Sequence, residues 1–176
     1  MKTNFFKITT FVTAFMFSSS VFAQVDGPIL NGVDNTSEYK TIELINMDRD
    51  LSTFANLLTL SGLNLSLALT TEPHTLLVPT NNAFTKMSIK RFAELTNPNN
   101  RAGLIKFMNE HFLSKKYNSS EFKNADVIST GNNTEIEIYQ DSYYLSFGGS
   151  KVIQADIKSK NGMIFIVDGI IEPTRY

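Results

Sequence analysis

The sequence has no cysteine, no tryptophan and only two histidines, His74 and His111, among its 176 residues. Without cysteine the chain can form no disulfide, no thiolate metal site and no lipid-modified cysteine. Two histidines far apart in the sequence, with no dense carboxylate loop and no Gly-x-Ser-x-Gly elbow, supply little material for a metal site or a nucleophile–base pair. We therefore expect no catalytic residue, no metal ligand and no cofactor.

Long hydrophobic runs are scarce, and the clearest one lies at the N-terminus. Lys2 and Lys7 flank the start of the apolar stretch ITTFVTAFMF, and VFA before Gln24 has the pattern of a signal-peptide cleavage site. A transmembrane anchor needs about 18 apolar residues, whereas Ser18 to Ser20 end this run early. We predict a signal peptide at residues 1–23, no transmembrane anchor, and export to a periplasm or to the outside of the cell.

An excess of positive charge is also missing. Cleavage after Ala23 would leave 14 basic and 17 acidic side chains, a formal charge of −3. No basic stripe is present, so we expect no nucleic-acid partner. Residues 24–40 mix Gly, Pro, Asn, Asp and Ser without a sustained period and predict an extended, partly ordered arm. Residues 41–174 then have the length and composition of one globular domain.

Three stretches show helical periodicity, at residues 51–62, 88–95 and 101–112. In the first, Asp50 is expected to cap the start and Gly62 to suit the end. The apolar residues of each stretch share one helical face, so the helices should pack against a sheet. These residues are Leu51, Phe54, Ala55, Leu57 and Leu58; Ile89, Phe92 and Leu95; and Leu104, Ile105, Phe107, Met108, His111 and Phe112.

The second half of the chain alternates with a period of two, which is typical of β-strands. The predicted inward positions are Ile136 and Ile138; Tyr143, Leu145 and Phe147; and Ile153, Ala155 and Ile157. Asn161-Gly162 predicts a type I′ turn before the last strand, because both central residues of that turn need a positive φ. The pattern predicts a β-meander.

The last strand, MIFIVDGII, is apolar at consecutive positions, so we expect it to be covered on both faces as a central strand. Its expected neighbour is the segment 75–84, in which Leu76, Leu77 and Val78 form a buried strand that Pro79 ends. Thr80 or Asn81 should then cap a helix that starts near Asn82.

Three segments carry a resemblance to a known family: TLLVPTNNAF, then LIKFMNEHFL, then KVIQADIKSKNGMIFIVDGIIEP. Over residues 40–173 the chain resembles the fasciclin (FAS1) domain. The resemblance implies an α+β fold, a wedge-like sandwich of about seven strands with several packed helices, exported and used for adhesion or surface association. The motif positions that match are Pro79, Thr80, Asn81, Phe84, Asn161, Gly162, Asp168 and Pro173.

The chain departs from this family at two positions. Phe165 stands where many relatives have histidine, and Glu110 stands where they have tyrosine before the middle histidine. His111 matches, and we carry it over as a candidate partner contact. The alternative is a hydrogen-bonded core histidine, since His111 lies on the apolar face of its helix. His74 follows Pro73 in a turn and is expected to be solvated.

A cluster of aromatic residues, Tyr139, Tyr143, Tyr144 and Phe147, is the other candidate surface, because tyrosine offers an apolar body with a polar tip. We single out Tyr143 and Tyr144 as partner-binding residues, with sheet packing as the alternative. Asn35, Asn64, Asn118 and Asn132 begin N-x-Ser/Thr sequons, which matter only if the source glycosylates them.

The favoured function is a non-enzymatic, exported adhesion module that binds a cell-surface protein or a polysaccharide. The alternative is a soluble carrier of a small apolar ligand, which an unfilled pocket beside Phe107, Met108 and His111 would support. An exported hydrolase would need a carboxylate pair or a Ser–His contact, and we predict that the protein is not an enzyme. Because one domain offers one binding face, we also expect weak self-association or an anchoring partner.

Overall fold

The computed structural model describes residues 29–174. The predicted signal peptide and the beginning of the predicted arm lie outside the described residues. The helices are α1 (Thr41–Met47), α2 (Ser52–Ser61), α3 (Leu63–Leu69), α4 (Asn81–Thr85), α5 (Ile89–Thr96) and α6 (Arg101–Glu110), with short 3₁₀ turns at Thr36–Glu38, Arg49–Leu51, Pro98–Asn100 and Ser119–Phe122. The strands are β1 (His74–Pro79), β2 (Phe112–Leu113), β3 (Val127–Ser129), β4 (Glu135–Gln140), β5 (Leu145–Phe147), β6 (Ser150–Lys158) and β7 (Gly162–Val167).

The seven strands form one mixed sheet in the order β2-β1-β7-β6-β5-β4-β3. β1 and β7 run parallel, with Leu77 opposite Phe165, and the other neighbours are antiparallel. The last strand therefore lies inside the sheet beside the segment predicted to be its neighbour, which confirms both predictions. The expected α+β fold of about seven strands with packed helices is confirmed as well.

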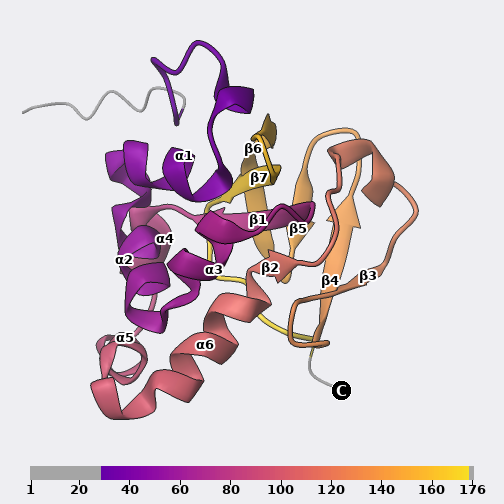
Figure 1. Ribbon diagram of the computed structural model, residues 1–176. Helices are drawn as coiled ribbons and strands as arrows, with labels where there is room; N and C mark the ends of the chain where they lie inside the picture. Colours follow the sequence, from indigo (N-terminus) through magenta and orange to yellow (C-terminus); the bar gives the residue numbers. More distant parts are fainter. Residues whose placement is uncertain (1–28, 175–176) are drawn as a thin grey trace, which may run out of the picture.

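β7 is buried along its whole length because its two faces belong to two different hydrophobic cores. Ile164 and Ile166 face a core formed with the helices, together with residues such as Phe54 and Leu104. Met163, Phe165 and Val167 face a second core, which strands β3 to β5 and Phe122 complete from the other side. In Figure 1 the helices gather on one side of β1 and β7, and β3 and β4 lie on the other. The consecutive apolar residues of the last strand follow from this two-sided burial.

The helices α2, α5 and α6 lie where the periodicity predicts them, and differences occur at the first residues of α2 and α5. α2 buries the expected apolar face, and Gly62 ends it with a φ of 82°. Asp50 does not cap α2, since the residue at the capping position is Leu51, which makes no side-chain cap bond. At α5, Phe92 and Leu95 pack inward, but Ile89 is 89% exposed because the helix begins there, clear of the core.

The strand alternation holds within β4 and β5 and breaks in β6. The inward placement predicted for Tyr143 is wrong, because β5 begins only at Leu145 and Tyr143 lies in the turn before it, 91% exposed. Ile136, Ile138 and Leu145 are buried as predicted. In β6 the pairing with β7 shifts twice, between Val152 and Gln154 and again before Ile157. Each shift moves the side chains to the other face of the sheet, so the inward placement predicted for Ile153 and Ala155 is wrong. Ile153 is 51% exposed, and Ala155 is exposed too.

The turn between β6 and β7 is not the predicted type I′ turn. Ser159 donates to the Gly162 carbonyl (3.1 Å), which places Lys160 and Asn161 at the centre, and neither of these has a positive φ. Gly162 is required for another reason: a Cβ there would lie 2.6 Å from the carbonyl oxygen of His74 in β1. Close strand approach, rather than turn geometry, explains this glycine.

The described part of the arm is attached to the domain. The Leu30 side chain is buried, and its backbone N–H donates to the Asp48 carboxylate at 2.6 Å. Further along, the backbone N–H of Lys160 donates to the Tyr39 carbonyl at 2.8 Å. These contacts order the segment from residue 29 onward.

Candidate functional site

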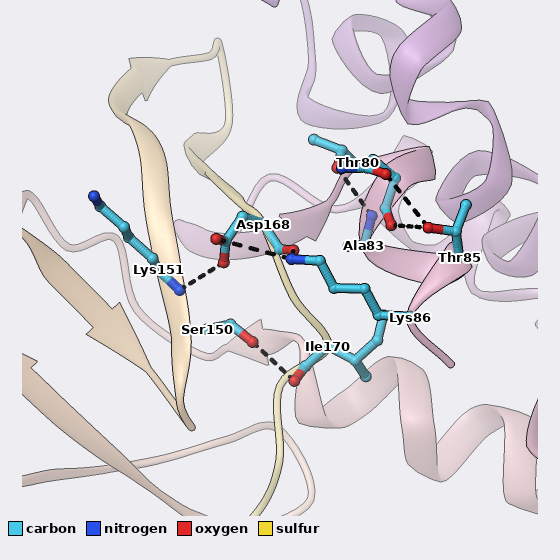
Figure 2. A network of polar contacts seen from close by, with 9 residues as sticks. Thr80, Ala83, Thr85, Lys86, Ser150, Lys151, Asp168 and Ile170 are labelled. Carbon is cyan, nitrogen blue, oxygen red and sulfur yellow. Dashed lines mark hydrogen bonds and ion pairs between the residues drawn. The ribbon is translucent and has the colours of Figure 1, made fainter. Parts of the chain in front are cut away.

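Several of the motif residues meet where the parallel strands β1 and β7 end. The Thr80 hydroxyl accepts from the Ala83 N–H (3.2 Å) and caps α4, as predicted. The Asp168 carboxylate accepts from the backbone N–H of Lys151 (2.9 Å), and the Lys86 ammonium donates to the Asp168 carbonyl at 2.8 Å. Figure 2 shows these groups converging from α4, β6 and the end of β7. Their bonds are internal to the protein, so they fix the chain after each strand.

Asn81 stabilises a helix other than its own. Its side-chain oxygen accepts from the Thr53 N–H in the first turn of α2 (2.8 Å), and its amide donates to the Arg49 carbonyl (2.8 Å). It therefore supplies, from the loop after β1, the cap that Leu51 cannot provide.

Asn161, another motif residue, performs a similar task inside the protein. Its side-chain oxygen accepts from the Thr41 N–H at the start of α1 (3.0 Å). Its amide donates to the carbonyls of Leu67 (3.4 Å) and Thr70 (3.3 Å) at the end of α3. One buried amide thus joins two helices to the turn between β6 and β7, which explains why this position takes asparagine.

The three remaining motif residues lie in the core, at the end of β1 and in the C-terminal segment. Phe84 packs edge-on against Phe92, with ring centroids 6.3 Å apart. Pro79 ends β1 opposite Val167, and Pro173 lies beyond β7, next to Thr174, whose N–H donates to the Glu135 carbonyl (2.9 Å).

His111 is fully buried, 0% exposed, with its ring 4.6 Å from that of Phe107. Nδ1 donates to the Phe107 carbonyl at 2.8 Å, so Nε2 is left to accept from the Ile171 N–H at 3.4 Å. Burial lowers the pKa of His111 to about 4, against an ordinary value of 6.5. The ring is therefore neutral and joins α6 to the C-terminal segment, as the core-histidine alternative expects. In this position it is out of reach of a partner.

Glu110, next to His111, is also buried. Burial raises the pKa of its carboxyl group, and the charges of Lys106 and Arg91 partly offset that effect. Arg91 itself forms an ion pair with Glu172 in the C-terminal segment.

His74 is not solvated, contrary to the prediction. Its ring is 1% exposed, stacks on Phe112 (5.5 Å between centroids) and accepts from the Thr41 hydroxyl (2.9 Å). Burial lowers the pKa of His74, too. The local sequence suggested a turn, whereas pairing with β7 starts at this residue and encloses it.

Tyr139, Tyr143 and Tyr144 form an exposed cluster at the β4–β5 turn, which we call the tyrosine patch. Their exposed fractions are 54%, 91% and 40%. The rings of Tyr139 and Tyr144 lie 5.3 Å apart, tilted by 35°. Sheet packing therefore does not account for these three residues, whereas Phe147, the fourth member of the predicted cluster, is in the core.

Two polar residues that the sequence did not single out hold the tyrosine patch in place. The Asp141 carboxylate accepts from the N–H groups of Tyr143 (2.7 Å) and Tyr144 (2.9 Å), and these bonds lower its pKa. The Tyr139 hydroxyl also donates to it at 3.2 Å, which raises the pKa of Tyr139. Lys151 lies 5.5 Å from the centre of the Tyr144 ring. An aspartate two residues before an exposed aromatic is a turn signal that could have identified Asp141.

Of the three residues expected to line a pocket in a carrier protein, only Met108 lies beside a cavity. Phe107 and His111 are packed against each other and against Phe54. A cavity of ≈ 200 Å³ touches Met108, on the side of α6 that faces α3.

The described residues offer neither a metal-binding cluster nor a single helix that could span a membrane. Residues 29–174 contain no group of three or more His, Cys, Asp and Glu side chains that could hold a metal ion. Within the same range no single helix is long and apolar enough to cross a membrane. The segments Arg49–Ser61 and Leu63–Leu69 reach that length and composition only when counted together, and they are bent by 96° where they meet.

Residues 49–173 match the family model described as the Fasciclin domain. The chain belongs to the fasciclin family. Fasciclin domains are generally non-enzymatic, often serve in adhesion and are commonly found in extracellular or secreted proteins. The family assignment agrees with the resemblance seen in the three sequence segments.

Two relatives of this fasciclin domain place it among known proteins. It is 28% identical over 101 residues to a protein named sll1483 from Synechocystis sp., over 57% of this chain and 56% of that protein. Its fold is similar to that of a FAS1 domain pair from the insect cell adhesion molecule fasciclin I, with a TM-score of 0.58 and 17% identity over 77% of this chain and 51% of that structure. The chain thus spans about half the length of each relative, and the structural likeness concerns the fold alone.

Proposed function

We propose that this fasciclin domain is an exported, non-enzymatic surface-association module that binds a polysaccharide through the tyrosine patch. The observation that supports this proposal is the patch itself: three exposed tyrosines at one turn, where the Asp141 carboxylate accepts from two of their backbone N–H groups and from the hydroxyl of the third. Tyrosine faces stack on the apolar faces of sugar rings, while the hydroxyl groups can bond sugar hydroxyls. Asp141 and Lys151 add a hydrogen-bond acceptor and a donor beside the rings.

A surface protein is the other partner that the tyrosine patch suits, since tyrosine is enriched at protein interfaces. His111 takes no part in either case, because it is buried. The family supports adhesion in general terms, and the exported location of this chain rests on the predicted signal peptide. We further propose weak self-association, because one patch per domain gives avidity only if copies cluster.

Co-sedimentation tests this function. Purified residues 24–176 are titrated against isolated cell envelopes and against extracellular polysaccharide, alongside a Tyr143→Ala/Tyr144→Ala double variant. We expect saturable binding that the double variant loses by at least tenfold. An Ile89→Ala variant, which removes an exposed apolar side chain from α5, is the matched control and should bind like the original chain.

Three outcomes would separate the possibilities. Binding to protease-treated polysaccharide supports the sugar partner, whereas binding that protease treatment of the envelopes abolishes supports a protein. Equal binding by the double variant and the original chain would contradict a role for the tyrosine patch.

Sedimentation velocity at increasing concentration checks self-association, and a strictly monomeric species that never sediments with envelopes would exclude it.

A carrier site centred on Phe107 and His111 has less support, because the two rings fill that space themselves. The cavity next to Met108 is lined by neither Phe107 nor His111.

A further inference from the structure

A cavity of ≈ 200 Å³ lies between α2, α3, α6 and the strands β1 and β2. The side chains that line it are Leu58, Leu63, Ser66, Leu67, Thr70, Leu76, Met108, Asn109 and Phe112. Its deepest wall consists of Leu58, Leu76 and Met108, which are at most 2% exposed. The cavity is thus built into the helical core and is separate from the tyrosine patch, which lies at the β4–β5 turn.

The lining restricts the charge of any ligand. None of the nine residues is ionisable, so an ion that entered would lose its hydration without meeting an opposite charge. A ligand of this cavity must therefore be uncharged and largely apolar.

Polar groups are nevertheless available at one side. The Ser66 hydroxyl and the Asn109 side-chain amide make no hydrogen bond with other residues in the described range 29–174, although both line the cavity. The Thr70 oxygen accepts from the Glu72 N–H (3.1 Å), which leaves its own proton free to donate. Few, convergent polar groups among apolar walls are typical of a small-molecule site, where they fix the orientation of the ligand.

The helix α3 forms one side of the cavity and offers an apolar approach to it. The chain bends by 96° at Gly62 between α2 and α3, and residues of α3 and of the end of α6 line the cavity together. Leu65 and Leu69, one turn apart on α3, are 63% and 72% exposed, and the lining residues Ser66 and Thr70 directly follow them. Exposed leucines next to a cavity of this kind provide an apolar surface for a ligand before it enters.

We propose that this cavity binds a small uncharged molecule, namely an aromatic ring with one hydroxyl or carbonyl substituent. The volume favours this size, because an apolar cavity of roughly 150 Å³ takes up benzene, and the space here is somewhat larger. The ring packs against Leu58, Leu76 and Phe112. The substituent bonds the Asn109 amide, with Ser66 and Thr70 as further partners.

The test uses benzyl alcohol, toluene and benzoate as probes of ¹⁵N-labelled residues 24–176, with chemical shifts followed by NMR. We expect saturable shifts confined to α3, α6 and β2 for benzyl alcohol, with a Kd of roughly 1 mM or lower. Toluene should bind more weakly, because it leaves the Asn109 amide without a partner. Benzoate should not bind, because its charge would be desolvated.

Two variants make the test specific. Ser66→Phe puts a bulky ring at the exposed side of the cavity and should abolish binding of both neutral probes. Asn109→Leu removes the amide with little change in volume. It should weaken binding of benzyl alcohol at least fivefold, whereas toluene should bind at least as tightly as to the original chain, because no amide is left without a partner. Each variant is first shown to unfold at a midpoint near that of the original chain, so that loss of binding cannot result from loss of structure.

The Tyr143→Ala/Tyr144→Ala double variant should bind benzyl alcohol normally, which separates this site from the proposed surface function. Shifts scattered over the surface, the absence of saturation up to about 20 mM, or unchanged binding by Ser66→Phe would each overturn the proposal.

Discussion

His111 shows how a single buried side chain makes stability depend on pH. Its folded pKa of about 4 lies below its ordinary value of 6.5. Between these two pH values the unfolded chain binds a proton that the folded chain excludes. The unfolding free energy therefore decreases as the pH falls through this window, and above pH 6.5 the full contribution is present.

We expect His111 to remove about 2 kcal/mol of stability between pH 7 and pH 5. His111→Gln should therefore flatten the pH dependence, although it lowers stability at pH 7 through lost packing. Urea unfolding at the two pH values measures this difference. His74→Gln serves as the control and should keep the part due to His111. In all of these chains Glu110 has the opposite effect on the pH dependence of stability, because burial raises the pKa of its carboxyl group. An equal slope in His111→Gln and the original chain would contradict the assignment.

Asn81 provides a second prediction at this scale. Asn81→Ala removes the acceptor for the Thr53 N–H and the donor to the Arg49 carbonyl, and should cost about 1–2 kcal/mol. Asn82→Ala is the matched control, since Asn82 is exposed and bonds only within α4. Its stability should stay within about 0.5 kcal/mol of the original chain. Urea midpoints measure both, and equal midpoints for the two variants would show that Asn81 does not cap α2.

At the level of the element, β7 is the strand on which both cores depend. A chain that ends at Lys160 loses the partner of β1 and the wall shared by the two cores, so it should have no cooperative unfolding transition. Thermal unfolding followed by near-UV circular dichroism checks this, with a chain ending at Thr174 as the control. A sharp transition in the shorter chain would show that the sheet can form without β7.

The elements that could be predicted from the sequence are those whose environment follows from local pattern. The central place of β7 follows from its consecutive apolar residues, and the alternation of β4 gives its buried face directly. Thr80 caps α4 through a bond that spans three residues. In each case the contacts that determine the structure join residues close in the sequence, or the spacing of the apolar residues indicates which faces of the strand are buried.

Features set by distant partners could not be predicted. Asn161-Gly162 looks like a hairpin turn, yet its residues are chosen by contacts with Thr41 and His74, which are remote in the sequence. The double register shift of β6 exposes Ile153 without any local sign. For the candidate site, the aromatic run indicated the exposed tyrosines, whereas the cavity is assembled from separate elements and leaves no motif.

For the whole molecule, the two proposed sites lie on different parts of the fold. The tyrosine patch is at the β4–β5 turn, at the far side of the second core from the helices, while the cavity lies among the helices. Changes at one site should therefore leave the other intact, since distant and independent sites are usually additive. This separation is what makes the two binding experiments independent of each other.

The pairing of β1 with β7 has a consequence for how the protein is made. β1 leaves the ribosome long before β7, the strand that must lie beside it, so the sheet cannot close around β1 until β7 has been made. Pairing across such a long stretch of chain is slow, because the intervening loop must be ordered first. Until then β1 presents an open edge and two apolar faces, which is the form that chaperones and proteases recognise. A nascent chain of this design keeps β1 without its parallel partner until β7 has been made.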